Sequence, residues 1–130
     1  MSEVLFRILL LHWLHRFDTG HLIVLIVERE KKRETLKALF LYKCISHGYP
    51  QIEFGKTDIS SAVYMELSNY APEAYSKVDS FAKEFVNKIG YEGTYYEDEK
   101  VKGVFFDSME YLKNKKFDNF IKSPDKYMIK

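Results

Sequence analysis

The chain has 130 residues, of which 46% are hydrophobic and 30% charged, with a formal net charge of +1. This length can bury one ordinary core but not two, so we expect a single domain over residues 1–130. The balanced charge excludes non-specific nucleic-acid affinity from bulk charge, and a single cysteine, Cys44, excludes a disulfide-stapled secreted domain, so we expect a cytoplasmic protein.

Residues 1–27 form a hydrophobic N-terminal segment. The sequence predicts a helix over residues 2–17 that is apolar on most of its faces. We interpret the apolar run at residues 22–27 as a strand, although periodicity alone does not separate a strand from a buried helix. Joining the two runs into one membrane span would bury Arg16 and Asp18 at high cost, so no transmembrane segment is expected.

The first helix also indicates an interface. It presents more apolar surface than a core of this size can easily cover, and uncovered surface of that kind marks a site of association. We therefore expect a homodimer whose interface includes Leu5, Leu9 and Trp13. The alternative is that this helix packs as core inside its own chain.

A dense run of mixed charge follows at residues 28–34. One interpretation is a phosphate-contacting patch, because residues 29–37 carry five basic side chains and two acidic ones. The other is a solvated helical face with charge pairs three or four residues apart. Apolar periodicity continues this helix to about residue 46, where Gly48 and Pro50 end it.

Three predicted elements come next without long loops. Residues 51–54 alternate polar and apolar side chains, which favours a short strand. Residues 58–69 have helical spacing of apolar residues. Residues 72–89 carry the clearest amphipathic stripe of the chain, in a helix that begins with Pro72.

The last third predicts a β-hairpin and a helix. Residues 94–96 and 101–106 are aromatic strands around an acidic turn, and a C-terminal helix covers residues 107–122 before a frayed tail at 123–130. The predicted fold class is therefore mainly α with a small β-hairpin, an α+β domain.

No pattern predicts catalysis or a bound cofactor. His12 and His15 lie three residues apart, as do Cys44 and His47, and the two pairs together could complete a tetrahedral zinc site. Folds built on zinc usually carry paired cysteines, which this sequence lacks. We therefore expect no metal, no cofactor and no enzymatic activity.

The element order over residues 31–106 is helix, short strand, helix, helix and hairpin. This order resembles the winged helix-turn-helix superfamily, and loosely the MarR-type regulators. Asp98-Glu99-Lys100 is similar to the wing motif Asp-x-Arg, with Lys in place of Arg. The resemblance implies a DNA-binding regulator of transcription whose outer helices form a dimer and whose second central helix reads the major groove.

The charge of this region departs from the resemblance. Residues 58–107 carry five basic and ten acidic side chains, a net charge of −5, whereas phosphate neutralisation supplies most non-specific DNA affinity. The alternative is a module that binds another protein, as a subunit or inhibitor of a larger assembly. If the partner is double-stranded DNA, the contacts are expected from the following basic side chains: Arg29, Lys31, Lys32, Arg33, Lys77, Lys83, Lys113, Lys115 and Lys116.

Overall fold

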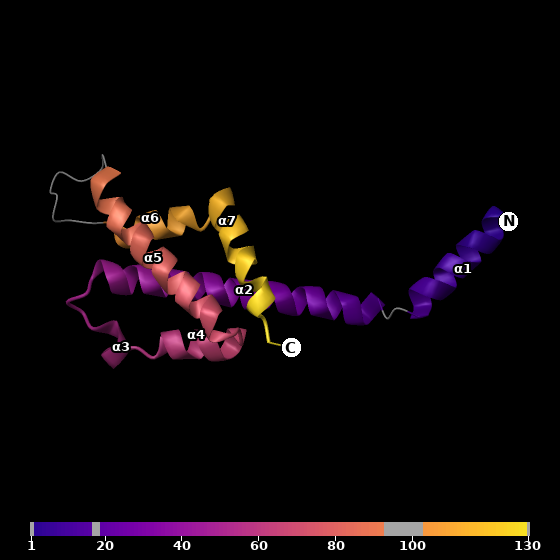
Figure 1. The fold of residues 1–130 in the computed structure, drawn as a ribbon, viewed down its shortest axis with the longest axis horizontal. Coiled ribbons are helices and arrows are strands. Elements are labelled where there is room, and N and C mark those ends of the chain that lie inside the picture. The colour runs from indigo at the N-terminus through magenta and orange to yellow at the C-terminus, as the bar shows by residue number, and fades with distance from the viewer. Residues whose placement is uncertain (1, 17–18, 93–102, 130) are drawn as a thin grey trace. The chain divides into compact units, whose positions relative to one another are not determined.

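The computed structural model describes residues 2–16, 19–92 and 103–129, and the regular structure within these ranges is entirely helical (Figure 1). An isolated antiparallel bridge joins Tyr70 and Met128. In chain order the elements are α1 (Glu3–Arg16), α2 (Thr19–Gly48), α3 (Phe54–Thr57), α4 (Ser60–Ser68), α5 (Pro72–Glu92), α6 (Val104–Tyr111), α7 (Lys115–Lys122) and a 3-10 helix η1 (Ser123–Tyr127).

The predicted α+β fold is wrong for the part of the chain that the structure describes. Residues 22–27 lie inside α2, and the supposed strand at residues 51–54 is a turn that leads into α3. Of the predicted hairpin, residues 94–96 and 101–102 lie outside the described residues, and residues 104–106 open α6 instead.

The burial pattern explains why α6 is a helix. Val104 and Ser108, four residues apart, are buried, while Phe105 and Phe106 are 57% and 59% exposed. A strand would alternate and bury every second side chain, so the exposure of Phe106 follows a helical period. Residues 22–27 are helical for another reason. They continue directly into a charged run whose residues favour helix, and the described residues contain no strand with which they could pair.

The chain divides into two compact units, Met1–Lys31 and Lys32–Lys130, which we describe separately. In the first unit, the large hydrophobic side chains of residues 4–11 and 22–27 are all between 45% and 67% exposed. Among the described residues, no helix is both long enough and apolar enough to cross a membrane. The expectation of a single domain stays a prediction.

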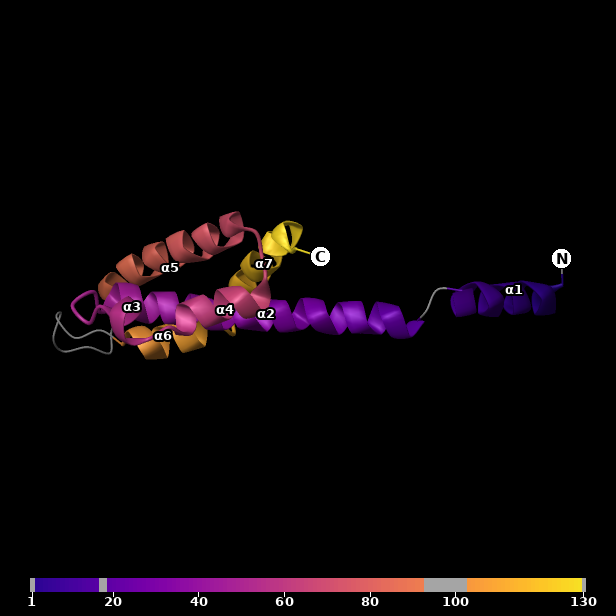
Figure 2. The ribbon, with the colours of Figure 1, turned by 90° about the horizontal axis from the view of Figure 1, so that it is seen from below.

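The second unit has a helical core. α5, α6 and α7 pack around the C-terminal half of α2 (Figures 1 and 2). Phe40 of α2 is fully buried at the centre, with its ring centroid 4.7 Å from that of Phe117 and 5.8 Å from that of Phe81. The helix predicted over residues 72–89 is confirmed as α5, whose Ala74, Val78, Ala82 and Val86 all face this core at a spacing of four residues.

Candidate interaction sites

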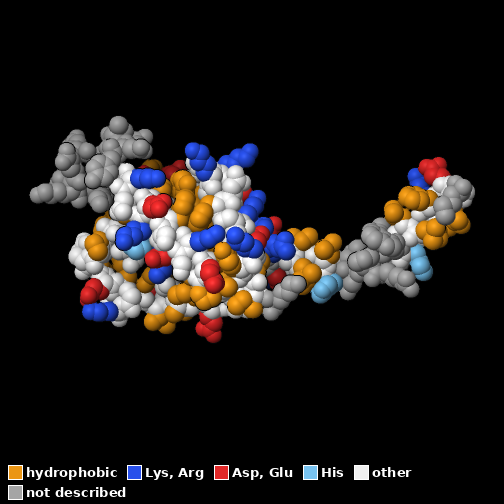
Figure 3. All heavy atoms as spheres, viewed as in Figure 1, with side chains coloured by type: hydrophobic (Ala, Val, Ile, Leu, Met, Phe, Trp, Pro, Cys, Tyr) orange, Lys and Arg blue, Asp and Glu red, His pale blue; other side chains and the backbone are white. Residues whose placement is uncertain are grey.

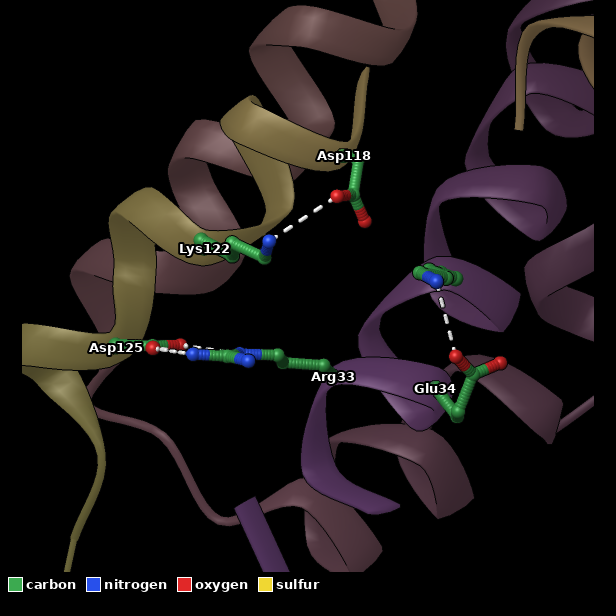
Figure 4. Close-up of polar contacts among 6 residues, drawn as sticks. Arg33, Glu34, Asp118, Lys122 and Asp125 are labelled. Atoms are coloured by element: carbon green, nitrogen blue, oxygen red, sulfur yellow. Dashed lines mark hydrogen bonds and ion pairs between the residues drawn. The ribbon is translucent and has the colours of Figure 1, made fainter. Parts of the chain in front are cut away.

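Two of the basic residues predicted to contact DNA instead hold the C-terminal segment of their own chain. Lys32 donates from Nζ to the carbonyl oxygen of Ile129 at 2.8 Å. Arg33 forms a bidentate ion pair with Asp125, in which Nε donates to Oδ1 at 3.1 Å and Nη2 donates to Oδ2 (Figure 4). Both side chains of this ion pair are less than a quarter exposed. Lys32 and Arg33 therefore attach the C-terminal segment to α2.

The remaining predicted cations are spread over several elements. Lys77 of α5 lies 5.2 Å from the ring centroid of Tyr127, and Lys113 pairs with Glu110 at 3.0 Å. In Figure 3 several Lys and Arg side chains gather over α7. That helix carries its own ion pair, between Lys122 and Asp118 (Figure 4). The other predicted contacts are all exposed: Arg29, Lys31, Lys83, Lys115 and Lys116.

The residues of the predicted homodimer interface lie on α1. Leu5 and Leu9 are 49% and 51% exposed there. The side chain of Trp13 lies outside the part of the molecule that the structure describes. The interface itself stays a prediction.

The Cys44 and His47 pair does not converge on a common point. Cys44 is fully buried beside Ser108, and burial raises the pKa of its thiol to about 12, so the thiolate that metals and electrophiles require is not formed at neutral pH. His47 is bonded through Nε2 to Oδ1 of Asp79 at 2.8 Å. Lys43 Nζ lies 3.7 Å from the same oxygen. The histidine thus belongs to a charged contact between α2 and α5.

The other predicted zinc pair lies on α1. His12 is exposed, and the side chain of His15 lies outside the described residues. No group of three His, Cys, Asp or Glu side chains in the described residues could hold a metal ion. The expectation that the protein binds no metal stays a prediction.

An open groove of about 520 Å³ runs between α5 and α7. Two of its residues, Phe81 and Phe120, have stacked rings with centroids 4.0 Å apart. Lys77 and Glu84 stand seven residues apart on α5 and place opposite charges along it. The groove therefore combines aromatic surface, hydroxyl groups and both signs of charge. The full lining is Ser76, Lys77, Ser80, Phe81, Glu84, Phe120 and Ser123.

Comparison with known proteins decides between the two classes of partner. A family model described as Tai4, the amidase immunity protein of the Type VI secretion system (T6SS), matches residues 34–119, about two thirds of the chain. The chain belongs to this family. No curated protein and no solved structure matched it. The matched range lies within the unit Lys32–Lys130 and carries most of its core.

Membership of the Tai4 family overturns the resemblance to winged-helix and MarR-type proteins, and with it the interpretation as a DNA-binding regulator of transcription. The resemblance depended on a hairpin that the described residues do not contain. The net charge of −5 over residues 58–107 was the signal in the sequence against DNA. The alternative, a module that binds another protein as a subunit or inhibitor of a larger assembly, agrees with the family, as does the expectation that the chain is not an enzyme.

Proposed function

We propose that this protein is an immunity protein that binds an amidase of a type VI secretion system and keeps it inactive. The match of the Tai4 family model to residues 34–119 is the observation that carries this proposal. The chemistry of the described residues agrees with it. Cys44, the one cysteine, is fully buried and burial raises the pKa of its thiol to about 12, so the proposal does not involve a covalent bond through this thiol.

The packed core suits such a role. A surface that is already rigid loses little conformational entropy on binding, so more of the contact energy appears as affinity. In the unit Lys32–Lys130, the aromatic cluster around Phe40 and the ion pair between Arg33 and Asp125 fix the helices and the C-terminal segment before any partner arrives.

The cellular location of an immunity protein depends on where its amidase acts. An immunity protein has to meet the amidase where the amidase meets its substrate, so the predicted cytoplasmic location stays a prediction that cell fractionation can test. Self-association through Leu5 and Leu9 is likewise a proposal. The mass of the purified chain in solution tests it, and a monomer at micromolar concentration would exclude it.

The decisive experiment titrates the purified full chain into each amidase effector of the type VI secretion system in the source organism. We expect heat of binding by calorimetry and a loss of amide hydrolysis that is complete near equivalence, because a tight inhibitor acts stoichiometrically. The heat-denatured chain is the control. If every amidase keeps its full activity with the folded chain in excess, the proposed function is wrong.

A further inference from the structure

Helix α4 presents a row of apolar side chains to the outside. Ile59, the N-cap residue of α4, is followed at intervals of four residues by Val63 and Leu67 of the helix, which places the three on one side, and they are 75%, 40% and 67% exposed. We call these three residues the α4 stripe. In Figure 3 hydrophobic side chains gather along the lower edge of the unit Lys32–Lys130, over α4.

The inner face of the same helix carries both apolar and polar side chains, because Tyr64 and Met65 are partly buried against the core beside the serines of α4. Ser68 is fully buried, and its hydroxyl donates to the carbonyl oxygen of Tyr64 at 2.7 Å. Ser60 and Ser61 are also partly buried. A surface helix normally keeps its apolar residues on the buried face, so the exposed α4 stripe is additional to the face that α4 packs against the core.

Contacts other than the α4 stripe hold α4 in place. The hydroxyl of Tyr75 donates to the carbonyl oxygen of Met65 at 2.6 Å and accepts from the backbone N–H of Tyr70 at 2.8 Å. Asn69 ends the helix in the left-handed conformation, with φ of 51°, and its N–H bonds to the carbonyl oxygen of Met65. At the other end, the hydroxyl of Tyr42 donates to the carbonyl oxygen of Asp58 at 3.1 Å. These hydrogen bonds position α4 without using the side chains of the α4 stripe.

The C-terminal segment extends the apolar surface at the end of α4. The N–H of Ile129 donates to the carbonyl oxygen of Asn69 at 3.1 Å, and the side chain of Ile129 is 45% exposed. Single exposed hydrophobic residues are normal on any protein, but a regular row of them with a neighbour at its end marks a docking surface.

Charge around the α4 stripe favours a partner of a different kind from the chain itself. Residues 53–69 carry three exposed acidic side chains, Glu53, Asp58 and Glu66, and one basic side chain, Lys56, a net charge of −2. A second copy docked on this face would bring two negative rims together. A groove with basic side chains at its rim would complement this surface instead.

We propose that the α4 stripe docks into an apolar groove of the amidase whose rim is basic. This inference rests on the proposed function and adds the surface through which it acts. A short helix that inserts residues i, i+4 and i+8 into an apolar groove is a recurrent way for proteins to bind. Glu66, on the turn between Val63 and Leu67, then faces the basic rim.

The test compares amidase binding by three forms of the full chain. I59E/L67E places two charges in the proposed interface and should weaken binding by about a hundredfold or more, because two anchor side chains lose their burial. L22E/I26E is the matched control, since Leu22 and Ile26 have the same spacing, are 60% and 52% exposed, and lie outside the region matched by the family model. It should stay within about threefold of the wild type.

A third variant tests the charge. E66K should weaken binding and slow association, and the loss should shrink as salt is added, because added salt screens the attraction that the glutamate provides. Since Ile59, Glu66 and Leu67 are all exposed, the circular dichroism spectra and melting temperatures of these variants should match those of the wild type.

Each outcome separates this inference from the proposed function. If the wild type binds the amidase and I59E/L67E binds it equally well, the docking surface is wrong and the immunity function stands. If the wild type binds no amidase, both the docking surface and the immunity function are wrong. If the wild type alone is a dimer that I59E/L67E dissociates while amidase binding is unchanged, the stripe belongs to a second copy and the inference is overturned.

Discussion

Replacing Gly48 with alanine should destabilise the protein, against the usual preference of helices. Gly48 is the last residue of α2. A β-carbon built on it would lie 2.6 Å from Cγ2 and 2.9 Å from Cγ1 of Val104, which is fully buried at the start of α6. Carbon atoms that are not bonded to each other do not approach so closely in proteins. Both methyl groups of Val104 belong to a β-branched side chain, which has few alternative rotamers.

The magnitude follows from two opposing effects. Alanine is favoured over glycine in a helix by about 1 kcal/mol. Forcing an extra carbon into a packed contact costs about 1–3 kcal/mol. Because the clash at Val104 involves two atoms of a buried side chain, we expect a steric cost in the upper part of this range, about 2–3 kcal/mol, so that G48A lowers the free energy of unfolding by about 1–2 kcal/mol.

Urea denaturation followed by circular dichroism measures this change, and Gly55 provides the matched control. Gly55 lies in α3, and a β-carbon there would meet nothing within 4 Å. G55A should therefore leave stability unchanged or raise it by a few tenths of a kcal/mol. In addition, G48A should cost less in a V104A background, with a coupling energy of about 1 kcal/mol or more. If G48A is as stable as the wild type, the proposed packing of α6 against α2 is refuted.

Three further predictions follow from individual contacts. R33M and D125N should each lower the free energy of unfolding by about 1–2 kcal/mol, and the double variant should lose less than their sum; additive losses would mean that the ion pair contributes nothing. Cys44 should react with a thiol reagent at pH 8 far more slowly in the folded chain than in urea, because burial raises its pKa to about 12; equal rates would place the thiol at the surface. Hydrogen bonds from the Ser60 side chain and backbone lower the pKa of Asp58, so the stability that this carboxylate contributes is present above its ordinary pKa and is lost as the pH falls through the lowered one; urea midpoints of D58N should depend less on pH in that acid range, and parallel curves would contradict this.

The sequence by itself determined the helices that have a clear apolar period. Residues 72–89 predicted α5 correctly because the side chains that face one core recur every three or four residues, and this spacing is a local property. The acidic charge of residues 58–107 was also visible without a structure, and it counted against DNA before the family was identified.

Tertiary structure decided the features that depend on residues far apart in the chain. An apolar run can become strand or helix according to what covers it. Val104, at the start of α6, packs against Gly48, 56 positions earlier, where the missing side chain leaves room for its methyl groups. Likewise, the sequence around Arg33 suggests a surface cation, whereas the structure pairs it with Asp125, 92 positions later. Local spacing shows that α4 is a helix, but only the packing shows which of its faces is buried. Tyr64, Met65 and Ser68 lie against the core while Val63 and Leu67 stay exposed, because the direction in which a helix turns its faces is fixed by its neighbours in space.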